Sequence, residues 1–206
     1  MSWNYCRRTI AELWQTPWLL LAQKLLRRLP FRPFDVGKMC FLRLDGLPNV
    51  PSSMLRGSAE VRFATEADLP RLIELQHKEA TFRERLAEGD RCVVAIADGR
   101  IVGYEWFSER AIHYESSWGY SIQIPGGFVY AYDAFIEADH RNTGLWLRFK
   151  ASLSDWMVEG HKRGVLTFVD YGNWASMRTH LRFGFEPSGN ILALRLIGLR
   201  MFRPVA

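Results

Sequence analysis

The pattern of apolar and polar positions predicts a series of strands over the last three quarters of the chain. The run EVRFA at 60–64 fits a strand, and the two apolar runs of CVVAIADGRIVGYEWFS (92–108) predict a hairpin that turns around Asp98-Gly99. A short strand also fits KMCFLRL at 38–44. Three later segments have the apolar and aromatic content of strands: FVYAYDAFIEA (128–138), VLTFVDY (165–171) and ILALRLIGL (191–199).

Helices are predicted between these strands. Thr65 and Asp68 have the spacing of a capping box, in which side chains satisfy free amides of the first helical turn. The segments predicted to be helical are 69–76, about 80–88, 145–160 and 173–183. The resulting order, β-α-α-β-β-β-α-β-α-β, indicates an α/β (α+β) fold with a mixed sheet rather than a doubly wound one.

The N-terminal quarter has a different character. Residues 5–29 predict a helix, broken near Pro17, with Lys24, Arg27 and Arg28 on one side and apolar residues on another. Packing on its own domain with the basic side in water is the favoured interpretation, and contact with an anionic membrane or an acidic partner is the alternative. We therefore expect a basic helical extension over 1–57 and a main domain over 58–206.

Charge is divided unevenly along the chain. Residues 1–57 contain nine Lys or Arg and three Asp or Glu, a net +6, whereas the remainder has 18 basic and 19 acidic residues, a net −1. The overall +5 therefore belongs to the extension, and charge gives no support for nucleic-acid binding by the main domain.

Cysteine usage and hydropathy favour a cytoplasmic protein. The three cysteines, Cys6, Cys40 and Cys92, are odd in number and far apart, so they predict neither a disulfide framework nor a metal site. The apolar run WLLLA at 18–22 is too short to span a bilayer and lacks the layout of a secretory signal.

The stretch DHRNTGLW (139–146) joins a predicted strand to a predicted helix through a turn that contains Gly144. The amides of a first helical turn have no partner within the helix, and together with the positive helix end and Arg141 they suit a pyrophosphate. An ordinary glycine-capped turn explains the same residues equally well. Trp146 is unexpected, because a phosphate-binding turn favours a tiny residue at that position.

A second segment, DYGNWASMRTHLRFGFEP (170–187), changes this balance. With this segment, the chain resembles the GNAT superfamily of acyl-CoA N-acyltransferases over about residues 58–195. Arg141 and Gly144 match the family's phosphate motif, Arg/Gln-x-x-Gly-x-Gly/Ala, and Trp146 departs from it. Its later motif is matched by Asn173, Ser176, Gly184 and Phe185, and His180 occupies the position of the usual tyrosine.

The resemblance implies a mostly antiparallel sheet that splits between its fourth and fifth strands, with the pantetheine arm of acetyl-CoA or another acyl-CoA in the gap. The amides of Asn142 through Leu147 would meet the pyrophosphate. The cofactor-binding residues implied in this way are Phe135, Ile136, Arg141, Asn142, Thr143, Gly144, Leu145, Trp146, Asn173 and Ser176.

Amine acylation needs a deprotonated amine, a polarised thioester carbonyl and a proton for the leaving thiolate. Asp133 is the first candidate base, because an isolated carboxylate among apolar and aromatic neighbours tends to have a raised pKa; a structural hydrogen bond is the equal alternative. Glu105 on the neighbouring hairpin strand is the second candidate. His180 is the candidate acid for the thiolate, with a non-catalytic helix position as the alternative and Tyr171 as the next residue to test.

The connection from Ala111 to Gly127 is long and aromatic. It is expected to help choose the acceptor, although a hairpin extension or a dimer contact fits the sequence as well; the oligomeric state is not predicted.

The sequence and the resemblance together predict an N-acyltransferase that moves an acyl group, acetyl being favoured, from CoA to a small-molecule or peptide amine by direct attack in a ternary complex. Neither motif contains a cysteine that could carry a covalent intermediate. Two alternatives remain: a donor with a longer acyl chain or an acyl carrier protein, and a non-catalytic module that keeps the fold, for which Trp146 is the main argument.

Overall fold

The computed structural model describes residues 20, 25–26, 34–55, 57–196 and 199–205, so the predicted basic helix lies almost entirely outside the described residues. The chain divides into two compact units. The first unit comprises Met1–Arg43, Tyr114–Tyr120 and Thr167–Ala206, and the second comprises Leu44–His113 and Ser121–Leu166. The predicted division into 1–57 and 58–206 stays a prediction.

The second unit is built on a sheet with the strand order β8-β7-β4-β3-β2. Neighbouring strands pair antiparallel except β7 and β8, which run parallel and pair only from Phe128↔Gly164 to Tyr130↔Leu166. The strands are β2 (Glu60–Phe63), β3 (Arg91–Ala97), β4 (Arg100–Ser108), β7 (Phe128–Ile136) and β8 (Gly164–Asp170), whose last residues belong to the first unit.

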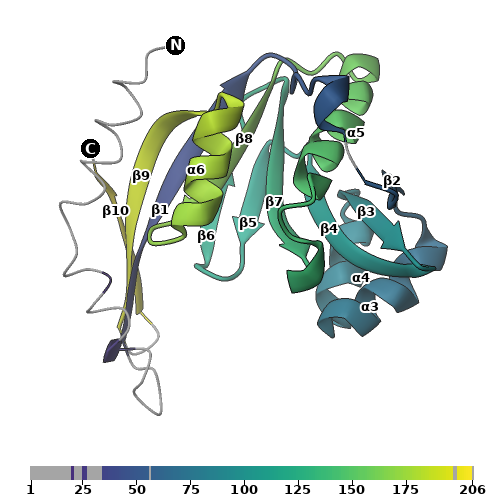
Figure 1. Cartoon of the computed structure of the whole chain (residues 1–206). Coiled ribbons are helices and arrows are strands. Elements are labelled where there is room, and N and C mark those ends of the chain that lie inside the picture. Colours follow the sequence, from purple (N-terminus) through teal and green to yellow (C-terminus); the bar gives the residue numbers. More distant parts are fainter. Residues whose placement is uncertain (1–19, 21–24, 27–33, 56, 197–198, 206) are drawn as a thin grey trace. The chain divides into compact units, whose positions relative to one another are not determined.

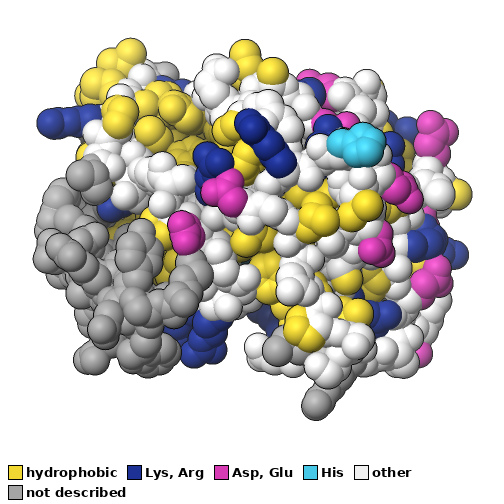
Figure 2. All heavy atoms as spheres, turned by 90° about the horizontal axis from the view of Figure 1, so that it is seen from above, with side chains coloured by type: hydrophobic (Ala, Val, Ile, Leu, Met, Phe, Trp, Pro, Cys, Tyr) yellow, Lys and Arg dark blue, Asp and Glu magenta, His cyan; other side chains and the backbone are white. Residues whose placement is uncertain are grey.

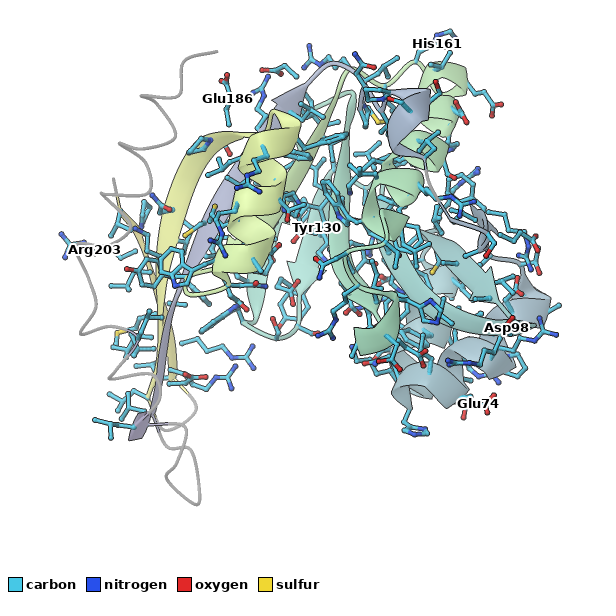
Figure 3. All side chains as sticks on the ribbon, viewed as in Figure 1. Glu74, Asp98, Tyr130, His161, Glu186 and Arg203 are labelled. Carbon is cyan, nitrogen blue, oxygen red and sulfur yellow. The ribbon has the colours of Figure 1, made fainter. Side chains whose placement is uncertain are left out.

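The predicted hairpin and capping box are confirmed. Asp98 and Gly99 both have positive φ, 50° and 75°, as the tight turn between β3 and β4 requires, and Figure 3 shows Asp98 at the end of this hairpin. The Thr65–Asp68 capping box opens the helical segment. The helices of this unit are η1 (Ser52–Met54), η2 (Glu66–Asp68), α3 (Leu69–Gln76), α4 (Glu79–Ala87), η3 (Ala138–His140) and α5 (Leu145–Glu159).

Strand β4 lies at the centre of the second unit and is buried from Ile101 to Ser108. Tyr104 and Trp106 pack on Phe82 of α4, with ring centroids 5.5 and 5.6 Å away. Phe107 packs instead on Trp156 of α5 at 6.5 Å. Because side chains alternate along a strand, α4 and α5 cover opposite faces of this sheet.

The first unit holds strands β1 (Phe34–Asp45), the end of β8, β9 (Glu186–Leu196) and β10 (Leu199–Val205) in the order β10-β9-β1-β8, together with α6 (Trp174–Phe183) (Figure 1). Met39, Trp118 and Ala193 form its buried core. The single final strand predicted at 191–199 is wrong: the chain forms two antiparallel strands there, paired from Leu199↔Leu196 to Val205↔Asn190. The strand predicted at 38–44 is confirmed within the longer β1.

The surface of the described residues carries both signs of charge. Figure 2 shows basic and acidic side chains interspersed on the face in view, as the net charge near zero of residues 58–206 leads one to expect. Within the described part of the chain, no helix is long and apolar enough to cross a membrane.

Candidate active site

A β-bulge interrupts the pairing of β7 with β4. Tyr104 pairs with Phe135 and Trp106 with Tyr132, so three steps along β7 oppose two along β4. Asp133 lies in this bulge with φ 44°, a left-handed conformation that is uncommon for any residue other than glycine. A bulge leaves one residue of the bulged strand, here on β7, without a ladder partner on the neighbouring strand.

Cations surround the carboxylate of Asp133. Arg85 Nη1 donates to Oδ2 at 2.6 Å, and Lys78 Nζ lies 3.3 and 3.4 Å from the two carboxylate oxygens. The Tyr104 hydroxyl donates to Oδ1 at 3.4 Å, and burial raises the pKa of this phenol, which keeps it neutral. The sequence analysis expected an isolated carboxylate at Asp133, and this expectation is wrong. The positive charges of Arg85 and Lys78 both contact it.

Arg85 is the residue that sequence reasoning missed here. Its guanidinium stacks over the rings of Tyr132 and Trp106, 4.8 and 5.2 Å from their centroids, and its side chain is 15% exposed. Burial is the largest single influence and acts to lower the pKa of Arg85, but the charge and hydrogen bond of Asp133 together with Tyr132 and Tyr104 outweigh it and leave the pKa raised. The sequence feature that could have identified Arg85 is its position three residues after Phe82. This spacing places both side chains on the inward face of α4.

A second polar network lies next to the bulge. Tyr132 donates its hydroxyl to Asp90 Oδ2 at 2.5 Å, and Arg110 Nη2 donates to the same oxygen at 2.9 Å. Arg110 Nη2 also lies 3.2 Å from His113 Nδ1, which makes that nitrogen the acceptor and His113 neutral. Burial lowers the pKa of His113 to about 4. This network fixes the ring of Tyr132 beneath Arg85.

Glu105 has a setting unlike the one expected of a candidate base. Glu105 lies between Tyr104 and Trp106 on β4, and side chains of successive strand residues point to opposite faces of the sheet. The Glu105 side chain therefore faces α5, on the side of the sheet opposite to the ion pair of Asp133 with Arg85. Lys150 Nζ of α5 donates to Glu105 Oε1 at 2.6 Å, and their side chains are 0% and 3% exposed. Burial raises the pKa of Glu105 and lowers that of Lys150, and each charge opposes the shift of the other.

The turn after β7 leads into α5 as the sequence predicted. Asn142 and Gly144 have positive φ of 62° and 86°, and Gly144 caps the helix. No side chain of the described residues caps the N-terminus of α5, and its first turn carries no acidic residue. Arg141 is exposed, with its Nε donating to the Ile136 carbonyl at 2.9 Å. The amides of this turn thus face an environment that suits an anion.

The motif residues of the first unit lie on α6. Asn173 is the N-cap, and its side chain accepts a hydrogen bond from the Ser176 amide at 3.3 Å. His180 is buried, with Nδ1 2.9 Å from the Ser176 carbonyl, which makes Nδ1 the donor, and its ring packs edge-on against Phe185. Tyr171, the next candidate acid, is buried at the end of β8.

The aromatic connection contains a two-stranded sheet of β5 (Ile112–Glu115) and β6 (Tyr120–Gln123), the hairpin alternative of the sequence analysis. Trp118 at its tip is buried against Gly37, and its indole donates to Asp170 Oδ1 at 3.0 Å. Trp118 is therefore a core residue of the first unit, and the expected role of the connection in acceptor choice stays a prediction.

Comparison with known proteins decides the fold. No family model matches the chain, and no curated protein does. Among solved structures, a GNAT-family acetyltransferase from Novosphingobium aromaticivorans superposes with a TM-score of 0.54 at 13% identity, over 83% of this chain and 66% of that one. The chain has the GNAT fold. The predicted fold class, a mostly antiparallel mixed sheet flanked by helices, is confirmed.

Other structures with this fold are similarly distant. The aminoglycoside N-acetyltransferase AAC(6')-Iy, solved with CoA, matches 62% of this chain and 91% of its own with a TM-score of 0.51 at 21% identity. A conserved protein of unknown function from Staphylococcus epidermidis matches with 0.54 at 11% identity, over 85% of this chain and 66% of its own. The chain thus spans about two thirds of the length of two of these three proteins.

The parallel pairing of β7 with β8 ends after three residues on each strand. The described residues include no group of three or more His, Cys, Asp or Glu side chains arranged to hold a metal ion.

Proposed function

We propose that this protein is an N-acyltransferase that transfers an acyl group, acetyl being favoured, from CoA to an amine. One observation carries the proposal. Strand β7 bears the bulge at Asp133 and is followed by η3 and then by the turn at Asn142–Gly144, so the proposed reaction centre and the proposed anion-binding helix N-terminus follow one another along one stretch of chain. A thioester donor with a pyrophosphate needs both features at such a spacing.

The residues present suit this donor. Acetyl-CoA supplies an activated thioester. The amides from Asn142 to Leu147, with Gly144 at their centre and Arg141 beside them, would bind its phosphates. Phe135 and Ile136, both half-buried after the bulge, would present backbone groups to the pantetheine amides. Asn173 and Ser176 at the start of α6 are proposed as further cofactor-binding residues on the resemblance alone.

Backbone donors at the bulge would polarise the thioester carbonyl, because charge develops on that oxygen as the amine attacks. Asp133 would accept the proton of the amine through Oδ1, where its contacts with Lys78 are long and the Lys78 side chain is 40% exposed. Arg85 would keep hold of Oδ2 and so fix the carboxylate. The C–N bond forms, the C–S bond breaks, and the amine proton goes to Asp133. The resemblance assigns protonation of the leaving thiolate to His180, which would act as an imidazolium and give its Nε2 proton while Nδ1 donates to the Ser176 carbonyl.

Two structures of the same fold support an amine acceptor: AAC(6')-Iy was solved with CoA and also with a bisubstrate analogue of CoA and acetylneamine. The acceptor of this protein is proposed only as a small-molecule or peptide amine. A cytoplasmic location and a membrane or acidic-partner contact through residues 5–29 remain proposals of the same kind.

The non-catalytic alternative rested on Trp146. The ring of this residue lies over the ammonium of Lys150, one turn along α5, and this position supports the proposal that the backbone amides at the helix N-terminus can meet a phosphate. A longer acyl donor or an acyl carrier protein stays open, and chain-length preference measured with acyl-CoA thioesters separates it from acetyl transfer.

The proposal is tested by thiol release from acetyl-CoA in the presence of a panel of amines. Amine-dependent release that Asp133→Asn reduces supports it. Release that does not depend on any amine, together with full activity of the variant, contradicts it.

A further inference from the structure

Trp146 is the second residue of α5 and lies in the turn proposed to bind phosphates. Its indole extends along the side of the helix and covers the ammonium of Lys150, 4.9 Å from the ring centroid. Residues four apart on a helix lie on the same face, so this contact spans the first turn of α5. A cation held over an indole in a desolvated site is strongly attracted.

The contact continues from the helix to the sheet. The Lys150 ammonium donates to Glu105 Oε1 at 2.6 Å, and Phe107 on the same strand lies 5.4 Å from that ammonium. Both charges are removed from water, so neither partner can leave the pair without a large penalty.

We propose, on the basis of the proposed function, that Trp146, Lys150 and Glu105 position the phosphate-binding turn by tying the first turn of α5 to β4. In this proposal a large residue is accommodated at position 146, where a small one was expected, because the Trp146 ring packs on the Lys150 ammonium of the buried ion pair. In this proposal Glu105 acts through Lys150 and Trp146 and is a positioning residue rather than a base.

The rest of α5 is anchored independently. Phe149, Leu153, Trp156 and Met157 are buried along the following turns, whereas in the first turn Leu145 is buried and Trp146 and Leu147 are half-buried. Loss of the Trp146 contact should therefore loosen residues 142–148 locally and leave the helix folded. Phosphate binding depends on amides held in one arrangement, so local loosening should weaken CoA binding.

The experiment compares two tryptophans of the same helix in the full chain. Trp146→Leu removes the proposed tie, and Trp156→Leu is the matched control, because Trp156 is buried against Phe63 and Arg91 farther along α5. CoA affinity is measured by calorimetry, global stability by thermal unfolding, and local order by hydrogen exchange at 142–148. Trp146→Leu should weaken CoA binding about tenfold and speed exchange at 142–148, with a small change in Tm.

Trp156→Leu should lower Tm and leave CoA affinity and exchange at 142–148 nearly unchanged. Wild-type CoA affinity and wild-type exchange in Trp146→Leu would overturn the inference, as would equal effects of the two variants. If the unaltered protein does not bind CoA, the proposed function fails, whereas faster local exchange in Trp146→Leu still supports the tie and unchanged exchange still overturns it.

A second comparison isolates the ion pair. Glu105→Gln with Lys150→Met removes both charges at similar volume, which avoids a buried unpaired charge. In this background Trp146→Leu should weaken CoA binding by clearly less than tenfold, because the cation under the ring is gone. An equal loss in both backgrounds would show that the ion pair does not carry the effect and would overturn its part in the proposal.

Discussion

Arg85 on α4 holds Asp133 on β7 through an ion pair of 2.6 Å between Nη1 and Oδ2. Asp133 has a left-handed backbone conformation in a bulge, which costs on the order of 1 kcal/mol or more for a residue other than glycine, so its surroundings must hold it there. The same ion pair leaves Oδ1 with only long contacts to Lys78 and Tyr104. Asp133 thus combines a fixed position with one oxygen, Oδ1, that is held less tightly than the other.

Asp133→Asn should reduce kcat/KM about a hundredfold, because the amide cannot accept the proton of the amine. Asparagine tolerates positive φ, so the bulge should persist and CoA affinity should stay near that of the unaltered protein. The pH profile of kcat/KM is measured by thiol release. A variant that keeps the kcat/KM of the unaltered protein across the pH range would remove Asp133 from this role.

His180→Gln should lower kcat about tenfold to a hundredfold, with little change in CoA affinity, if His180 supplies the proton to the thiolate. Its ring is held by the Ser176 carbonyl at 2.9 Å, and glutamine can donate to the same oxygen. Tyr171→Phe is the comparison, since Tyr171 is the other candidate acid near the end of β8. Full turnover in His180→Gln combined with a loss in Tyr171→Phe would reassign the acid.

His113 should make stability depend on pH. Burial lowers its pKa from the ordinary value of 6.5 to about 4, so the unfolded chain binds more protons than the folded protein between these values. The free energy of unfolding should be largest above pH 6.5 and fall by up to about 3 kcal/mol as the pH drops to about 4. Urea unfolding across this range measures it.

His113→Phe provides the matched variant, because it keeps an aromatic ring against Tyr130 and Tyr132 and has nothing to titrate. Its stability should vary less with pH over the same window. An unchanged slope would show that other groups cause the acid sensitivity.

Arg141→Gln should weaken CoA binding severalfold and reduce the dependence of the affinity on salt, because an exposed charge beside the phosphate-binding turn acts through screened attraction. Arg83→Gln on α4 is a suitable control, since Arg83 is exposed and paired with Glu79. Calorimetry at low and high salt measures both. The same loss in the two variants would point to a general effect of net charge.

The sequence predicted those parts of the fold that local spacing determines. The helix at Leu69–Gln76, its capping box and the turn at Asp98-Gly99 each depend on a few adjacent residues, and all three are confirmed. The second strand of the C-terminal pair was missed because residues 191–205 are apolar almost throughout and no turn signal stronger than Gly198 divides them.

The site depended on long-range pairing that no local pattern reveals. Asp133 contacts Arg85 and Lys78, which are 48 and 55 residues away in the sequence. The bulge that orients Asp133 is visible only in the register of β7 against β4. Asp133 and Glu105 were the first and second candidate bases, as acidic residues on neighbouring predicted strands. Because side chains alternate along β4, Glu105 faces α5 and pairs with Lys150. Nothing in the sequence around Lys150 indicated that this lysine would be buried.

The central claim is that this protein binds and uses an acyl-CoA, and calorimetric titration of the full chain with acetyl-CoA tests it most directly. The account predicts saturable binding of one acetyl-CoA per chain, weakened by Arg141→Gln and by Trp146→Leu. The absence of binding at about millimolar ligand, a concentration that detects interactions as weak as about −4 kcal/mol, would contradict it.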